Sequence, residues 1–140
     1  MSPTQIFLSH TKHDKSLCDQ IDMIAPRAGV KLFRSEYESI PTPPWQMILK
    51  EINNSKAVFV LVGKQLAFLQ RAGGRNWDYT QNWMAFEIGV AAAAGKDVWA
   101  IVENGAEYNF PIPYVNHFMV VDFTGFAKPK LHAVFLQRNI

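Results

Sequence analysis

The sequence predicts an α/β fold in which a five-stranded parallel sheet is flanked by helices. Strand-type and helix-type segments alternate five times along 140 residues, and most connections between them are short. The strand-type segments are nearly continuous apolar runs, as is typical of strands buried on both faces of a parallel sheet. This alternation favours right-handed crossovers, and the common order for five such strands is 2-1-3-4-5.

The predicted strands are short, and each is bounded by polar, glycine or proline-containing segments. They are Ile6–Leu8, Val30–Phe33, Ala57–Val62, Val98–Val102 and Phe118–Phe123. The third is apolar throughout, which places it at the centre of the sheet. With helices on both faces, the strand order defines a flavodoxin-like three-layer fold.

Segments with apolar residues at helical spacing are predicted to be helices. The first spans Lys15 to about Ala25, with Asp14 as its N-cap. The closing helix spans about Ala127–Leu136. The second helix follows a proline-rich loop, and its predicted core face consists of Trp45, Ile48, Leu49 and Ile52.

The third predicted helix contains the most informative residue of the chain. It spans about Tyr79–Ala94, begins at a capping box formed by Asp78 and Gln81, and ends at Gly95. Glu87 is the only charged residue inside this span. Because an unpaired buried charge costs roughly 3–5 kcal/mol, a lone carboxylate on so apolar a helix is a candidate functional group.

Ligands of such sheets bind at the carboxyl ends of the strands, where the strand order reverses. Here the reversal lies between the first and third strands, and the loops that follow them are Ser9–Asp14 and Gly63–Gln81. The second loop is long for a compact domain, as functional loops are, and it leads into the third helix. We therefore expect Ser9, His10 and the start of that helix around one crevice, with Trp83 on the same helix face as the carboxylate.

Composition indicates one soluble domain spanning residues 1–140, of which 49% are hydrophobic. The net charge is only +2 and the basic residues are scattered, which argues against a nucleic-acid partner. No apolar run is long enough to cross a membrane, no signal pattern is present, and the single Cys18 suits a reducing cytoplasm. His10 and His13 are expected to be solvated, because no third metal ligand lies at useful spacing.

Common ligand signatures of this architecture are missing. A phosphoacceptor receiver needs acidic residues after the first strand and an aspartate at the end of the third, but the chain has Ser9-His10 and Gly63-Lys64 there. A flavin carrier needs a glycine-rich phosphate loop, and the first loop contains no glycine. No dinucleotide-type or triphosphate-type glycine motif occurs in the sequence.

The order of several segments resembles that of TIR (Toll/interleukin-receptor) domains. Ile6–Lys15 resembles their first conserved box, and Trp83-Met-Ala-Phe-Glu87 matches the Trp-x-x-x-Glu pattern that NAD-cleaving TIR enzymes carry on the third helix. The segments similar to their second strand, variable loop, second helix and third strand are Val30–Trp45, Ile48–Ser55 and Ala57–Val62. The resemblance extends to about Leu136.

The resemblance implies an NAD+ glycohydrolase or cyclase of immune defence or signalling. Such an enzyme releases nicotinamide and gives ADP-ribose or a cyclic isomer; NAD+ is its substrate, and no cofactor or metal is implied. Glu87 is the implied catalytic residue, which binds the ribose hydroxyls and stabilises positive charge, and Trp83 lines the nicotinamide pocket. Ser9 and His10 are candidates for contacts to the phosphates or the ribose.

The end of the second strand adds two candidate residues. Arg34 and Ser35 could contact the diphosphate. Ser35-Glu36 stands where TIR domains usually have an acidic residue, and Ile40–Pro44 replaces the usual glycine of the variable loop. By resemblance, the loop Ser35–Pro44 of a neighbouring copy completes the site, so self-association with other TIR domains is expected.

Two other functions remain open from the residues. One is a TIR adaptor that binds other TIR domains without chemistry; the other is a nucleoside deoxyribosyltransferase-like enzyme or nucleotide hydrolase, in which Glu87 would be a nucleophile. The residues also have structural interpretations. Glu87 could reach water or pair with a basic residue, Ser9 could simply end its strand, and Arg34 could be a surface salt-bridge partner.

Overall fold

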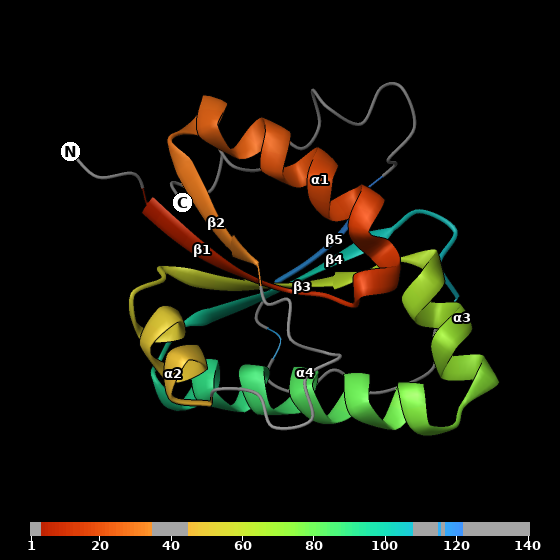
Figure 1. The fold of residues 1–140 in the computed structure, drawn as a ribbon. Coiled ribbons are helices and arrows are strands. Elements are labelled where there is room, and N and C mark those ends of the chain that lie inside the picture. The colour runs from red at the N-terminus through yellow and green to blue at the C-terminus, as the bar shows by residue number, and fades with distance from the viewer. Residues whose placement is uncertain (1–3, 35–44, 108–114, 116, 122–140) are drawn as a thin grey trace.

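The computed structural model describes residues 4–34, 45–107, 115 and 117–121, and it confirms the predicted sheet (Figure 1). Five parallel strands pair in the order β2-β1-β3-β4-β5. The strands are β1 (Thr4–Ser9), β2 (Val30–Arg34), β3 (Ala57–Val62), β4 (Asp97–Glu103) and β5 (His117–Val121). The predicted closing helix and the loop Ser35–Pro44 lie outside the described residues.

Helices cover both faces of the sheet. They are α1 (Lys15–Ile24), α2 (Trp45–Asn53), α3 (Lys64–Ala72) and α4 (Arg75–Ala93), with short 3-10 segments η1 (Lys12–Asp14) and η2 (Ala25–Ala28). Figure 1 shows α1 on one face of the sheet, and α2 and α4 on the other. Along the described residues, no helix has the length and apolar character that crossing a membrane requires.

The pleat of β1 sends alternate side chains into two separate cores. Ile6 and Leu8 belong to the cluster that contains the buried residues of α1, whereas Phe7 belongs to the cluster formed with α2 and α4. Successive side chains of a strand point to opposite faces. Ser9, two residues after Phe7, therefore faces the α4 side at the carboxyl end of β1.

Helix α4 ends where the sequence predicts but begins earlier. Gly95 has φ 72°, and its N–H donates to the Ala92 carbonyl at 3.1 Å while the Lys96 N–H donates to the Ala91 carbonyl at 2.9 Å. These two bonds form a Schellman motif. The predicted capping box is wrong, because α4 begins at Arg75 and the N-cap position is Gly74.

The segment between β3 and the third helix, for which the sequence predicts a long loop with one or two helical turns at Lys64–Arg71, is mostly helical. Helix α3 occupies its first half, and the turn into α4 is made by Gly73 and Gly74, with φ values of 67° and 85°. Only glycine adopts such angles at little cost, so the pair confines the irregular backbone to one tight corner.

Trp45 was predicted on the core face of α2, and this prediction is wrong. It is 52% exposed, although Ile48 and Ile52 of the same helix are fully buried.

Carboxylates from other elements hold the first turn of α3. The Asp14 carboxylate accepts hydrogen bonds from the Gln65 and Leu66 N–H groups at 3.2 and 3.1 Å, and Glu103 Oε1 accepts from the Lys64 N–H at 2.7 Å. Asp14 was expected to cap α1, but its side chain makes no capping bond there. It caps α3 instead, and so ties the loop after β1 to the loop after β3.

Gly63 has no room for a side chain, because a Cβ at this position would overlap with the Asp14 carboxylate. We predict that Gly63→Ala lowers the free energy of unfolding by about 1–3 kcal/mol through overpacking. Gly89→Ala is the matched control: nothing lies within 4 Å of its Cβ position inside α4, so alanine there should raise the free energy of unfolding by roughly 0.5–1 kcal/mol. Urea denaturation measures both, and equal effects of the two changes would contradict the packing argument.

Candidate active site

Glu87 lies on the face of α4 that packs against the sheet. The buried residues of α4 recur at helical spacing along one stripe; they are Thr80, Met84, Glu87, Ile88 and Ala91. The Glu87 side chain is only 2% exposed. The helix therefore carries its carboxylate into the interior, and the interpretation that this group simply reaches water is excluded.

One partner of this carboxylate comes from β1. The Ser9 hydroxyl donates a hydrogen bond to Glu87 Oε1 at 2.7 Å, and Ser9 is completely buried. Two features of the fold bring the pair together: the pleat of β1 turns Ser9 toward α4, and the helical stripe turns Glu87 toward the sheet. The two residues are 78 positions apart in the chain.

The Ser9–Glu87 hydrogen bond fixes the orientation of the Glu87 carboxyl group. Hydrogen bonds to an ionised group are short and about twice as strong as neutral ones, and in a buried setting the charge is felt more strongly than in water. A carboxylate has about four acceptor positions on its two oxygens, and the Ser9 hydroxyl occupies one of them. Such a group can accept hydrogen bonds from sugar hydroxyls and stabilise a developing cation beside it.

His10 is buried, contrary to the expectation that it is solvated. It is 4% exposed, and its Nδ1 lies 3.3 Å from the Leu8 carbonyl oxygen. The tautomer with hydrogen on Nδ1 donates to that carbonyl and makes Nε2 an acceptor. Thr11, the next residue, is also fully buried and accepts a hydrogen bond from the His13 N–H at 3.4 Å. The start of the first loop is thus an ordered part of the interior next to Ser9.

Arg34 is engaged on the α1 side. Its Nη1 atom lies 2.7 Å from Asp19 Oδ1 and 3.4 Å from Asp22 Oδ2. The Arg34 guanidinium holds the pKa of the Asp19 carboxyl below its ordinary value, with Lys15 contributing. The salt-bridge interpretation of Arg34 is therefore the one that the structure supports. Ser35 lies outside the described residues.

Trp83 occupies the helical turn before Glu87 and is partly buried. Its ring makes an edge-to-face contact with Phe86, with centroids 5.7 Å apart and planes at 80°. Both rings pack against the core cluster on the α2–α4 side of the sheet. The structure thus gives Trp83 a packing role, and its contact with a substrate stays a prediction.

Asp14 is the buried acid that local sequence patterns assigned to the wrong helix. It is 3% exposed, and burial raises the pKa of its carboxyl from 3.8 to about 6, although the N–H groups of Leu66 and Gln65 act in the opposite direction. The Glu103 carboxylate raises the pKa of Asp14 further, and His13 lowers it. Asp14 positions the loop that carries Ser9 and His10.

Among the residues that the structure describes, no group of three or more His, Cys, Asp or Glu side chains is arranged to hold a metal ion.

Comparison with known proteins gives a fold likeness. The sequence matches no protein-family model and no curated protein. Among solved structures, the chain is similar to a CMP N-glycosidase from Clostridium botulinum, with a TM-score of 0.57 and 16% sequence identity. The likeness covers 94% of this chain and 99% of that one, and it shows that the two share a fold.

Asp14 makes a testable contribution to the pH dependence of stability. Because the pKa of its carboxyl is raised in the fold, the folded protein holds a proton between about pH 4 and 6 that the unfolded chain releases. The contribution of Asp14 is therefore fully present below about pH 4 and is lost as the pH rises through 6. We predict that the unfolding free energy of the wild type, minus that of Asp14→Asn, falls by roughly 2 kcal/mol between pH 4 and pH 7.

Urea denaturation of both proteins at the two pH values gives this difference. A difference that stayed constant, or grew with pH, would show that the two N–H donors outweigh burial at Asp14 and would contradict the prediction.

Proposed function

We propose that the chain is a TIR-type NAD+ glycohydrolase or cyclase, in which Glu87 is the catalytic residue and Ser9 positions it. The observation that carries the proposal is the buried Ser9–Glu87 hydrogen bond of 2.7 Å. It joins the residue that ends β1 to the one carboxylate of the Trp-x-x-x-Glu segment, at the carboxyl edge of the sheet where such folds bind ligands. Soluble action in the cytoplasm, in immune defence or signalling, belongs to the same proposal.

The proposed reaction breaks the bond between C1′ of ribose and the pyridinium nitrogen. The bonding electron pair leaves with nicotinamide, which departs as a neutral molecule because the nitrogen was cationic, so no general acid is needed. Glycosidases with alcohol leaving groups need two carboxylates because the oxygen must be protonated. Glu87 accepts hydrogen bonds from the ribose hydroxyls and stabilises the sugar cation, and Trp83 lines the nicotinamide pocket. Water then bonds to C1′ and loses a proton to the solvent, or a ring nitrogen of the adenine bonds to C1′ instead.

A pyrimidine nucleotide N-glycosidase is the second candidate. The observation in its favour is the likeness to the CMP N-glycosidase across 94% of the chain. A pyrimidine base leaves with a negative charge unless it is protonated, so this reaction calls for a proton donor as well as a carboxylate. An adaptor without chemistry is less well supported, because docking at the surface gives no role to a carboxylate that is 2% exposed.

The decisive assay incubates the protein with NAD+ and, in parallel, with CMP or deoxynucleosides, and quantifies the released base. We predict nicotinamide release by the wild type, and a loss of about 10²–10³-fold or more in Glu87→Gln, because the variant removes the charge that stabilises the transition state. Glu51→Gln is the matched control, since Glu51 lies on α2 beside Gln5 near the start of β1, and its activity should equal that of the wild type.

Undiminished nicotinamide release by Glu87→Gln would refute the role of Glu87. Release of cytosine from CMP without nicotinamide from NAD+ would favour the second candidate, and base exchange on deoxynucleosides would favour a deoxyribosyltransferase. No reaction with any substrate would leave the adaptor as the better account.

Self-association is part of the proposed mechanism by resemblance to TIR domains, with Ser35–Pro44 of a neighbouring copy completing the site. We predict that activity per milligram rises with protein concentration, because dilution separates the copies. Rate measurements over a hundredfold range of concentration, or with a crowding agent, test this. Specific activity that does not change with concentration would contradict the need for assembly and leave the role of Glu87 intact.

A further inference from the structure

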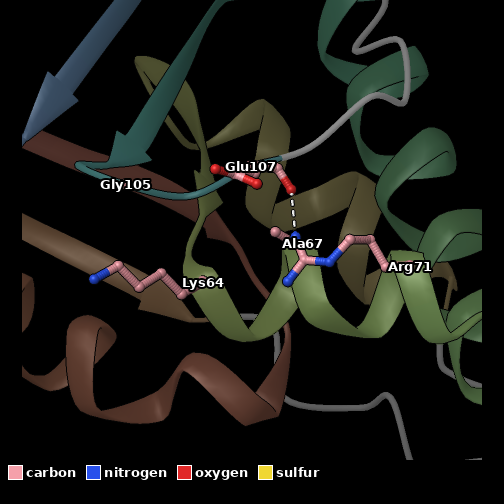
Figure 2. Close-up of a pocket in the computed structure, with 5 residues that line it drawn as sticks. All are labelled: Lys64, Ala67, Arg71, Gly105 and Glu107. Carbon is pink, nitrogen blue, oxygen red and sulfur yellow. Dashed lines mark hydrogen bonds between the residues drawn. The ribbon is translucent and has the colours of Figure 1, made fainter.

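A small cavity lies between α3 and the turn that follows β4. Its volume is about 140 Å³, and it is lined by Lys64, Ala67, Arg71, Gly105 and Glu107 (Figure 2). The first three residues are spaced three and four positions apart, so they share one face of α3. Because the middle residue is an alanine, this face is hollow between two cationic side chains.

Arg71 is fixed at one end of the hollow. Its Nη1 donates a hydrogen bond to the backbone carbonyl of Glu107 at 2.7 Å, and Figure 2 shows the guanidinium turned back along the helix toward Ala67. A guanidinium has five N–H donors in a planar fork. Arg71 is exposed, and among the described residues its side chain makes this one hydrogen bond, which uses one of the five donors.

Lys64 stands at the other end. Its side chain lies against Gly105, where a Cβ would come within 3.1 Å of Lys64 Cε, so the glycine leaves room for the lysine. No ion pair of the Lys64 ammonium occurs among the described residues. In Figure 2 the ammonium points away from Arg71, but the four-carbon stem of lysine is flexible and can turn the charge into the hollow.

The side chains that line the cavity are positive on balance; outside the lining, Glu103 Oε1 accepts a hydrogen bond from the Lys64 backbone N–H. Two cations line the cavity against one acid, Glu107, and Figure 2 shows the Glu107 carboxylate pointing away from the Arg71 guanidinium. The volume is below the roughly 300–1,000 Å³ of pockets that enclose drug-sized molecules. The cavity therefore suits one small anionic group rather than a whole nucleotide.

We propose that this cavity binds a phosphate group, as the free ion or as the monoester of a small metabolite. The planar fork of arginine matches two phosphate oxygens, and lysine adds a mobile point charge. None of the lining residues belongs to the Ser9–Glu87 pair, so the inference does not rest on the proposed activity.

Titration calorimetry with inorganic phosphate, in phosphate-free buffer of low ionic strength, tests the proposal. We expect a dissociation constant of about 1 mM for the wild type. Lys64→Gln and Arg71→Gln should each weaken binding about tenfold, since each removes a charge-assisted hydrogen bond. Glu107→Gln should tighten binding, because it removes the one acidic side chain among the lining residues. Arg75→Gln is the matched control: Arg75 is exposed at the start of α4 and does not line the cavity.

Lys64→Gln is the cleaner of the two cation variants, because Arg71→Gln also loses the bond to the Glu107 carbonyl. A parallel titration with ribose 5-phosphate identifies the source of the group: equal or tighter binding points to a monoester, and binding of phosphate alone points to the free ion. The proposal is overturned if phosphate does not bind at concentrations well above about 1 mM. It is also overturned if Arg75→Gln weakens binding as much as Lys64→Gln, which would indicate a general response to net charge.

Discussion

The hydrogen bond between Ser9 and Glu87 is the interaction on which the functional interpretation of this protein depends. It is buried, so the carboxylate has exchanged water for a fixed donor from another layer of the fold. Burying a carboxylate without such a partner would cost several kcal/mol, and an apolar residue at position 87 would suit the stripe of Met84, Ile88 and Ala91 better. A sequence that keeps an acid there accepts a stability cost, which is the usual mark of a functional group.

The rest of the carboxyl edge is built to hold that pair in place. The loop after β1 carries Ser9 at one end and Asp14 at the other, and Asp14 is bound to the first turn of α3. Glu103, at the end of β4, binds the same turn. Three strand ends are thus joined through the backbone N–H groups of one short helix, whose partial positive charge favours carboxylates. Rigid support of this kind is what a reacting group needs to keep its direction.

The sequence predicts the features that depend on periodic patterns and on neighbouring residues. It misses hydrogen bonds between residues that are far apart in the chain. The strand order is predicted from the apolar runs and from the alternation of strands and helices. The end of α4 is predicted from Gly95, because a left-handed backbone conformation after a helix is adopted mainly by glycine. The sequence also predicts that Ser9 lies near the third helix, and its hydrogen bond to Glu87 follows from the pleat face that Ser9 shares with Phe7. Asp14 was misassigned because capping rules consider neighbours in the chain, whereas its partners lie 51 and 52 positions away. The start of α4 was misplaced because Gly73 and Gly74 end one helix and begin the next within a single corner.

The most direct test of the central claim is to observe Glu87 itself while a ligand binds. The side-chain carboxyl carbon of Glu87, assigned by comparison with Glu87→Gln, can be followed by NMR during titration with a carbocyclic NAD+ analogue that cannot form the sugar cation. The account predicts a saturable shift of the Glu87 signal and no shift of the Glu51 signal. Saturable binding that leaves the Glu87 signal unchanged would contradict it, as would a complete lack of binding.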